Sequence, residues 1–209
     1  MKIVVFGASG RMGKFVVQQA LKAGHQVTAF LRISSKLGIE HPNLNIIQGD
    51  VMDAEKVEKA IAGQEAVIST LGPTRPHVPG MMETAAENIV SAMQKHGIKR
   101  LISTTGAGVR DPQDQPKLFD KFMKTILTLI ARDVLRDSET NVKVIRSSDL
   151  EWTIVRFPRL IDGPHTGEYR VGYIGKNSGS QISRADGADF ILKELEKGEY
   201  IHKAPMASY

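Results

Sequence analysis

The sequence predicts an α/β fold in which helices cover both faces of a doubly wound, mostly parallel sheet. Apolar, β-branched runs of four to six residues alternate along the chain with segments of helical periodicity, the pattern of repeated βαβ units. The first run, residues 3–6, is apolar without alternation, as is typical of a strand covered on both faces. Right-handed crossovers then place helices on both sides of the sheet.

The elements follow one another in a regular order. We expect strands over residues 2–6, 26–31, 44–48, 66–69, 100–104 and 152–156. We expect helices over residues 11–23, 54–62, 81–96, 118–136, 138–147 and 185–197. Gly24, Gly63 and Gly97 each follow an expected helix end, where a left-handed residue commonly ends a helix.

The last quarter of the chain has a different composition. Two prolines and five glycines interrupt residues 156–181, which indicates loops and a small hairpin. The helix expected over residues 185–197 follows them. We therefore expect one domain over residues 1–209, in which residues 157–209 contribute a small cap on the substrate side.

Composition excludes several kinds of chemistry. The 209 residues contain no cysteine, so disulfides, thiolate metal sites and cysteine nucleophiles are excluded. The six histidines are scattered without ligand spacing, and we expect no metal site. The net charge of +5 attracts anions without identifying one, and nucleic acid is not favoured. No apolar run approaches a membrane span, so we expect a cytoplasmic protein without membrane association.

Three glycines between the first strand and the first helix carry the strongest functional signal. They are Gly7, Gly10 and Gly13, in the spacing G-x-x-G-x-x-G. Glycines at such a turn let the backbone approach a pyrophosphate and let helix and strand pack closely at the helix N-terminus. The alternative is a glycine-rich turn that binds nothing, but the strand-turn-helix context favours dinucleotide binding.

Arg32 ends the second strand, about twenty residues after the glycine motif, where sites that prefer NAD often carry an acidic residue. An arginine at this position suits the 2′-phosphate of NADPH, so we expect NADPH, with NADH as the alternative. Ser34, Ser35 and Lys36 offer further donors. The competing interpretation of Arg32 is a solvated cation at a strand end.

Two further segments follow predicted strands and are placed to line the ligand. Gly49-Asp50-Val51 follows the third strand, and Ser69-Thr70-Leu71-Gly72-Pro73 follows the fourth. Asp50 is expected either to accept a hydrogen bond from the adenine amine or to cap the following helix.

These motifs resemble the atypical short-chain dehydrogenase/reductases, in particular their compact NAD(P)H-binding branch with the NmrA-like proteins and the flavin reductase/biliverdin-IX beta reductase group. Further segments that carry the resemblance are Ser103-Thr104-Thr105-Gly106, Trp152-Thr153-Ile154-Val155-Arg156 and Ile182-Ser183-Arg184-Ala185-Asp186. The resemblance covers nearly the whole chain. It implies a Rossmann-type fold and a nicotinamide cofactor.

The resemblance also implies roles for individual residues. The pyrophosphate is expected at Gly7, Ser9, Gly10, Arg11 and Met12, with Gly13 completing the motif. The 2′-phosphate is expected at Arg32, the adenine at Asp50 and Val51, and the ribose and phosphates at Leu71 and Gly72. The nicotinamide is expected near Thr104 and Thr105, with backbone contacts to its carboxamide from Pro158, Arg159, Leu160 and Ile161.

The usual acid of the wider superfamily is missing. The enzymes of that superfamily reduce carbonyls with a Tyr-x-x-x-Lys pair. In this chain, none of the four tyrosines, Tyr169, Tyr173, Tyr200 and Tyr209, has a lysine four residues later. Lys121 is at most a cationic substitute. An acceptor such as a flavin or quinone takes its proton from solvent, so we expect NADPH-dependent reduction of a small planar electron acceptor. Arg159, where relatives often have a histidine, is expected to meet an anionic acceptor.

Two other functions remain open. The branch includes cofactor sensors that catalyse nothing, so a non-catalytic NAD(P)-binding redox sensor is the main alternative. A sugar-nucleotide epimerase shares the glycine motif, but the missing Tyr-x-x-x-Lys and the short C-terminal region argue against it.

One apolar stretch has two interpretations. Residues 119–130 present an apolar surface wider than one helical stripe, which we expect to be mostly core. Its excess is available to roof a substrate pocket or to join a partner helix, and a homodimer is compatible with it. The preceding loop, residues 106–116, is a candidate lid.

Overall fold

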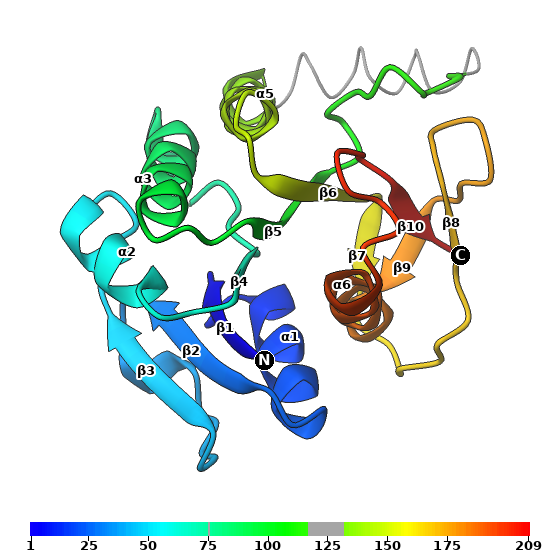
Figure 1. Ribbon diagram of the computed structural model, residues 1–209. Coiled ribbons are helices and arrows are strands. Elements are labelled where there is room, and N and C mark those ends of the chain that lie inside the picture. Colours follow the sequence, from blue (N-terminus) through cyan, green and yellow to red (C-terminus); the bar gives the residue numbers. More distant parts are fainter. Residues whose placement is uncertain (75, 117–131) are drawn as a thin grey trace.

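A parallel sheet forms the centre of the computed structural model, which describes residues 1–74, 76–116 and 132–209. Across these residues the sheet has eight strands in the order β3-β2-β1-β4-β5-β6-β10-β8 (Figure 1). The strands are β1 (Lys2–Phe6), β2 (Gln26–Leu31), β3 (Leu44–Gln48), β4 (Ala66–Ser69), β5 (Arg100–Gly106), β6 (Glu151–Phe157), β8 (Arg170–Gly172) and β10 (Met206–Ser208). All neighbouring strands are parallel except β10 and β8. The predicted doubly wound parallel sheet is confirmed.

Helices cover both faces of this sheet (Figure 1). On one face lie α2 (Ala54–Ile61), α3 (Met81–Lys95) and α5 (Arg132–Arg146), and on the other lie α1 (Arg11–Lys22) and α6 (Arg184–Lys197). Strand β1 contributes to both cores, because Val4 and Phe6 pack with the first group of helices while Ile3 and Val5 pack with the second. This two-sided burial explains why the strand is apolar without alternation.

Most helix boundaries agree with the sequence signals. Gly24, Gly63 and Gly97 have φ angles of 84°, 74° and 68°, so the predicted left-handed residues follow these helix ends. A short 3-10 helix, η1 (Ser34–Lys36), follows β2. The N-cap of α2 is Asp53, whose side chain accepts from the backbone N–H of Lys56. The suggestion that Asp50 caps this helix is therefore wrong.

The predicted break between two helices at Asp137 is also wrong, because α5 runs from Arg132 to Arg146 without interruption. Ser138 does not begin a new helix. Its hydroxyl donates to the carbonyl oxygen of Val134, 2.9 Å away and one turn earlier, so its polar group is satisfied inside the helix. Residues 117–131 lie outside the described residues, and with them the earlier part of the helix expected from residue 118, the apolar surface at residues 119–130, and Lys121.

The C-terminal region does more than cap the fold. Strand β10 pairs with β6 and β8, so the end of the chain extends the main sheet, which the sequence pattern did not predict. A second sheet of two parallel strands is formed by β7 (Arg159–Ile161) and β9 (Gln181–Ser183). The expected small hairpin corresponds to a tight turn closed by an antiparallel bridge between Tyr173 and Lys176.

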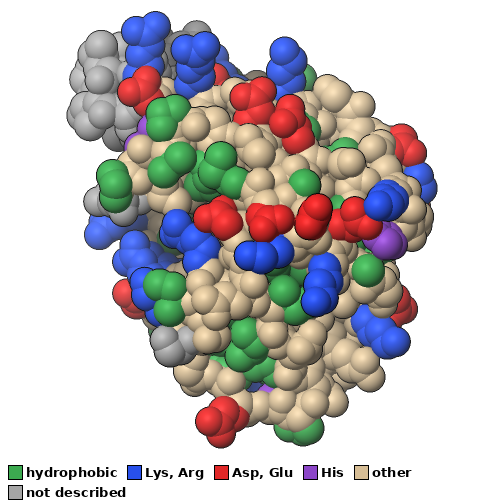
Figure 2. Space-filling model, turned by 90° about the vertical axis from the view of Figure 1, so that its left-hand side faces the viewer, with side chains coloured by type: hydrophobic (Ala, Val, Ile, Leu, Met, Phe, Trp, Pro, Cys, Tyr) green, Lys and Arg blue, Asp and Glu red, His purple; other side chains and the backbone are tan. Residues whose placement is uncertain are grey.

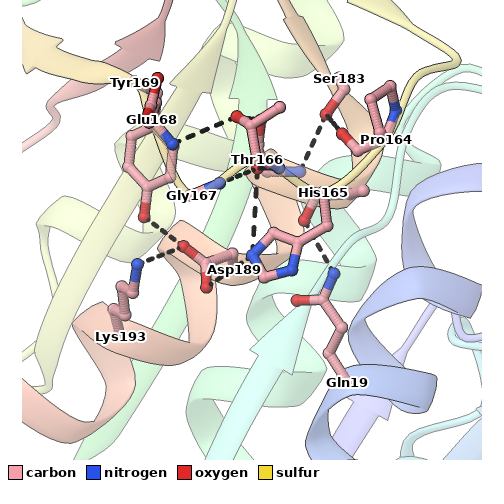
Figure 3. A network of polar contacts seen from close by, with 12 residues as sticks. Gln19, Pro164, His165, Thr166, Gly167, Glu168, Tyr169, Ser183, Asp189 and Lys193 are labelled. Atoms are coloured by element: carbon pink, nitrogen blue, oxygen red, sulfur yellow. Dashed lines mark hydrogen bonds and ion pairs between the residues drawn. The ribbon is translucent and has the colours of Figure 1, made fainter.

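A polar network fastens the segment after β7 to α6 (Figure 3). Tyr169 donates its hydroxyl hydrogen to Asp189 at 2.6 Å, and Lys193 lies 2.7 Å from the same carboxylate. The hydroxyl of Ser183 donates to the carbonyl oxygen of Pro164 at 3.0 Å. This network ties the irregular segment to the helix that packs on α1.

Charges on the face shown in Figure 2, the left-hand side of Figure 1 where α2 and β3 lie, are mixed in sign. Asp and Glu side chains form a row with Lys and Arg side chains beside it. One such pair joins α3 to α2, with Lys95 Nζ 2.7 Å from Glu58 Oε1. Among the described residues drawn on this face, Lys and Arg side chains lie beside Asp and Glu side chains, which differs from the single basic patch that binds a nucleic-acid backbone.

Within the described ranges, no helix has both the length and the apolar character needed to cross a membrane.

Candidate nucleotide and acceptor site

A cavity of about 320 Å³ opens where the strand order reverses, between β1 and β4. Ligands of open α/β sheets bind at this crevice, beyond the carboxyl ends of the strands. The segments after β1, β2, β3 and β4 all contribute to its wall. The lining residues are Gly7, Ser9, Gly10, Phe30, Leu31, Arg32, Gly49, Asp50, Val51, Met52, Thr70, Leu71, Gly72, Pro73, Thr74, Val78 and Met81.

The glycine motif packs closely against its own turn. Gly7 has a φ angle of 77°, a conformation that favours glycine, and the Gly10 N–H donates to its carbonyl oxygen at 2.9 Å. A Cβ atom on Gly13 would overlap the Gly7 carbonyl group. No acidic residue occupies the first turn of α1 and no side chain caps its N-terminus. The N-terminus is thus accessible to a pyrophosphate and has the partial positive charge that attracts one.

Arg32 and Asp50, one a basic and the other an acidic residue, both line this cavity. Arg32 is exposed at the end of β2 and lines the cavity, which places a guanidinium within the same pocket as the glycine turn. Asp50 also lines the cavity, and its Oδ1 accepts a hydrogen bond of 3.0 Å from the backbone N–H of Met52. These residues fit a dinucleotide, because the pocket combines backbone donors, a cation and an acceptor.

A second cavity of about 670 Å³ lies beyond the ends of β5 and β6. Pro73 lines both cavities. The second is lined mostly by apolar and small residues, namely Pro73, Gly106, Ala107, Gly108, Val109, Arg110, Asp114, Pro116, Val134, Leu135, Ser138, Phe157, Pro158, Arg159, Ile174, Ser178, Gly179, Ser180 and Met206. An apolar cavity with a few polar groups next to a nucleotide site is the usual form of a small-molecule site.

Asp114 is the acidic residue of this second cavity, and it is already neutralised. Arg156 holds both of its oxygens, with each of two hydrogen bonds measuring 2.8 Å. Burial alone would raise the pKa of Asp114, but the hydrogen bonds from Arg156 and from the backbone of Asp111 and Ile174 lower it overall. The carboxylate therefore stays ionised and occupied by protein donors.

The loop over residues 106–116, the candidate lid, is tied to neighbouring segments by ion pairs and hydrogen bonds. Asp114 binds Arg156 of β6, and Asp111 lies 2.6 Å from Arg146 of α5. The loop also joins the turn after β8, because the Gln115 N–H donates to the carbonyl oxygen of Ile174 at 2.8 Å. In this structure it forms a fixed wall of the second cavity.

The site residues predicted from the sequence fall into three groups. Eight line the first cavity: Gly7, Ser9, Gly10, Arg32, Asp50, Val51, Leu71 and Gly72. Two line the second: Pro158 and Arg159. Seven line neither of these two cavities: Arg11, Met12, Gly13, Thr104, Thr105, Leu160 and Ile161. Their proposed contacts with a ligand stay predictions.

Physical reasons explain this last group. Met12 and Thr104 are buried, and Gly13 faces the Gly7 carbonyl from α1. Leu160 packs against the core on the side of α1 and α6, and Arg11 is exposed at the start of α1. Thr105 and Ile161 are half-buried.

Sequence reasoning missed several lining residues. Phe30, Val78 and Met81 give the first cavity an apolar wall. Met206 and Ser178 join the second from the C-terminal region, which is brought to the site by the pairing of β10 with β6 and of β7 with β9. No local signal distinguishes these positions.

Among the described residues, no group of three or more His, Asp or Glu side chains is arranged to hold a metal ion.

Comparisons with known proteins agree with this geometry. Residues 7–198 match the model of a family described as NAD(P)H-binding. The protein YwnB of Bacillus subtilis is 29% identical, and the match covers 96% of this chain and 94% of YwnB. A short-chain dehydrogenase/reductase of Veillonella parvula, solved in complex with NADP, superposes with a TM-score of 0.83 over 100% of this chain and 94% of the other at 20% identity.

A shorter match involves a plant enzyme. Phenylcoumaran benzylic ether reductase TP7 of Nicotiana tabacum is 38% identical over 80 residues. That match covers 34% of this chain and only 26% of the enzyme. The chain therefore spans nearly all of YwnB but about a quarter of the plant reductase.

Proposed function

The chain belongs to the NAD(P)H-binding family, and we propose that it is a reductase that passes hydride from NADPH to a planar acceptor such as a flavin or a quinone. One observation carries this proposal. The first cavity, which contains the glycine turn and Arg32, shares Pro73 with a larger, mostly apolar cavity. A dinucleotide in the first thus ends beside a space suited to a flat, apolar ring.

Each part of the first cavity has a role in this proposal. The free N-terminus of α1 and the turn at Gly7 and Gly10 bind the pyrophosphate. Arg32 binds the 2′-phosphate and makes NADPH the preferred cofactor, since a guanidinium fork matches phosphate oxygens. Asp50 and Val51 take the adenine, and Leu71 and Gly72 take the ribose. The Veillonella structure has the same fold and was solved with NADP, which supports a nicotinamide dinucleotide in this cavity.

The chemistry requires little of the second cavity beyond orientation. Bound NADPH supplies a hydride and solvent supplies a proton, so that NADPH, one proton and the acceptor yield NADP⁺ and the acceptor reduced by two hydrogens. The titratable residues that line the second cavity in the described part of the chain are Arg110, Asp114 and Arg159. Asp114 is ionised and paired. The acceptor therefore takes its proton from solvent. Thr104 and Thr105 are proposed to position the nicotinamide from the end of β5.

Multiple turnover tests the proposal. Purified protein is mixed with NADPH and a panel of flavins, quinones and azo dyes, and oxidation is compared with the rate without protein. We expect saturable oxidation with at least one acceptor. If the protein binds NADPH but no acceptor accelerates its oxidation, the reductase proposal is wrong and the non-catalytic redox sensor takes its place. The cytoplasmic location and the homodimer stay predictions.

A further inference from the structure

We propose that the acceptor carries an anionic group, a phosphate or a carboxylate, which Arg159 binds together with Arg110 at the second cavity. This inference rests on the proposed function and names the substrate class of that site. It depends on which charges around the cavity are already occupied by protein partners and which are not.

Two acids beside the second cavity, in the part of the chain that the structure describes, are bound by arginines that do not line it. Asp114 is bound by Arg156, whose side chain is fully buried. Asp111, on the same loop, is bound by Arg146 of α5. These partners leave neither carboxylate available to the arginines of the cavity wall.

A third acid near Arg159 is occupied in the same way. Asp162 lies 2.5 Å from the guanidinium of Arg184, which begins α6. Arg184 also donates to the carbonyl oxygen of Leu160 at 3.1 Å. The carboxylate closest in sequence to Arg159 therefore belongs to another arginine.

Arg159 itself has a fixed backbone and an exposed side chain. It begins β7, pairs in register with Gln181, and its N–H donates to the carbonyl oxygen of Ser180 at 3.2 Å. Ser180 also lines the second cavity. Within residues 1–74, 76–116 and 132–209, the guanidinium of Arg159 forms no ion pair. The strand thus presents a cation at the cavity from an ordered position.

Arg110, in the loop after β5, provides a second cation at this cavity. It is exposed, follows the buried Val109, and lines both this cavity and a smaller depression beside α5. Its neighbour Asp111 is bound by Arg146, so it does not neutralise Arg110. Among the described lining residues, Asp114 is paired with Arg156, whereas Arg110 and Arg159 form no ion pair, and such cations attract anionic ligands.

The apolar residues of the cavity wall fit the ring of the acceptor. Phe157, Pro158, Ile174 and Met206 offer apolar surface, which suits a flat conjugated ring. A guanidinium binds phosphate or carboxylate through parallel hydrogen bonds. The acceptor that fits both features is a planar ring with an anionic substituent.

Matched acceptors and variants test this inference. FMN and riboflavin differ by the phosphate, while anthraquinone-2-carboxylate and anthraquinone differ by the carboxylate. Each pair is assayed with the unmodified protein and with Arg159→Gln, Arg110→Gln and Arg159→Lys. Arg170→Gln is the control, because Arg170 is an exposed cation of β8 that does not line the cavity.

We expect Arg159→Gln to raise KM about tenfold for the anionic member of at least one pair, which corresponds to about 1.4 kcal/mol. The rise in KM for the uncharged member of the same pair should be several-fold smaller. Arg110→Gln should give a smaller effect in the same direction, Arg159→Lys a partial one, and Arg170→Gln none. The pair that responds identifies phosphate or carboxylate as the recognised group. Equal effects on both members of each pair, or no effect on either, would overturn the inference.

Binding without turnover separates this inference from the proposed function. Quenching of FMN and riboflavin fluorescence is measured with protein saturated with NADP⁺, where no hydride is available. A preference for FMN that is lost in Arg159→Gln supports the anion site even if every turnover assay fails. Turnover of uncharged acceptors without any preference for anionic ones overturns the anion site and leaves the reductase proposal intact.

Discussion

Arg156 and Asp114 form a bidentate ion pair across the wall of the second cavity, with Nη1 2.8 Å from Oδ2 and Nη2 2.8 Å from Oδ1. The side chains are 0% and 3% exposed. The remaining donor atoms of Arg156 are also used, because Nε donates to the carbonyl oxygen of Ala204 at 2.8 Å. The pair therefore joins the loop after β5 to β6 and to the segment before β10.

Replacing Asp114 by Asn should destabilise the protein by about 3–5 kcal/mol, because it leaves the buried charge of Arg156 without its partner. The free energy of unfolding in urea measures this. Asp149→Asn is the matched control, since Asp149 pairs with Lys99 at an exposed site, where solvent screens the ion pair, and should cost far less. Equal losses in the two variants would show that burial of the Arg156 pair has no special effect.

Replacing Arg32 by Gln should weaken NADPH binding about tenfold or more, since a hydrogen bond to a charged group contributes about 1.5–3 kcal/mol. NADH binding should change little, because NADH lacks the 2′-phosphate. Calorimetric titration of both cofactors measures the ratio of their affinities. Lys22→Gln, which removes an exposed cation in the last turn of α1 that does not line the cavity, is the control. An unchanged ratio in Arg32→Gln would remove Arg32 from the phosphate site.

Replacing Gly13 by Ala should destabilise the protein by about 1–3 kcal/mol and weaken binding of either cofactor, because the added methyl group would overlap the Gly7 carbonyl. Gly72→Ala provides the stability control, since a Cβ atom there has no neighbour within 4 Å. Thermal unfolding and cofactor titration give the two measurements. Unfolding of Gly13→Ala at the temperature of the unmodified protein would contradict the close packing of the turn.

The stability of the C-terminal region should depend on pH through Asp186. Its carboxylate accepts hydrogen bonds from the Thr166 N–H at 2.8 Å, the Thr166 hydroxyl at 2.6 Å, the Gly167 N–H at 2.9 Å and the Tyr209 hydroxyl at 2.7 Å. Burial alone would raise the pKa of Asp186, but these hydrogen bonds lower it to about 2.

Because the pKa of Asp186 is lower in the folded protein than in the unfolded chain, near 3.9, its contribution is complete above about pH 5. It is lost as the pH falls toward 2. The difference in unfolding free energy between the unmodified protein and Asp186→Asn should therefore be larger at pH 5 than at pH 3. An equal difference at both pH values would show that the ionised form has no special role.

The sequence was sufficient for the parts of the molecule that local pattern determines. Strands β1 to β6, the glycine turn and the glycines after α1, α2 and α3 all depend on neighbouring residues. The resemblance to the compact NAD(P)H-binding branch, based on the same motifs, is confirmed by the family match over residues 7–198.

The parts that sequence reasoning missed depend on contacts between distant segments. Strand β10 is three residues long and forms only because β6 and β8 lie on either side of it. The partner of Asp114 is 42 residues away, and no spacing rule connects Asp114 to Arg156. The second cavity is assembled from such contacts, so its charge balance was visible only in the fold, although Arg159 was already a candidate.

Rapid mixing under anaerobic conditions tests the central claim most directly. Protein loaded with one equivalent of NADPH is mixed with excess FMN, and the absorbances of reduced nicotinamide and of oxidised flavin are followed together in a single turnover. The account predicts that one equivalent of flavin is reduced for each bound NADPH, at a rate that saturates with FMN and exceeds the rate without protein. Bound NADPH that stays reduced at every concentration of FMN and of the other planar acceptors would contradict it.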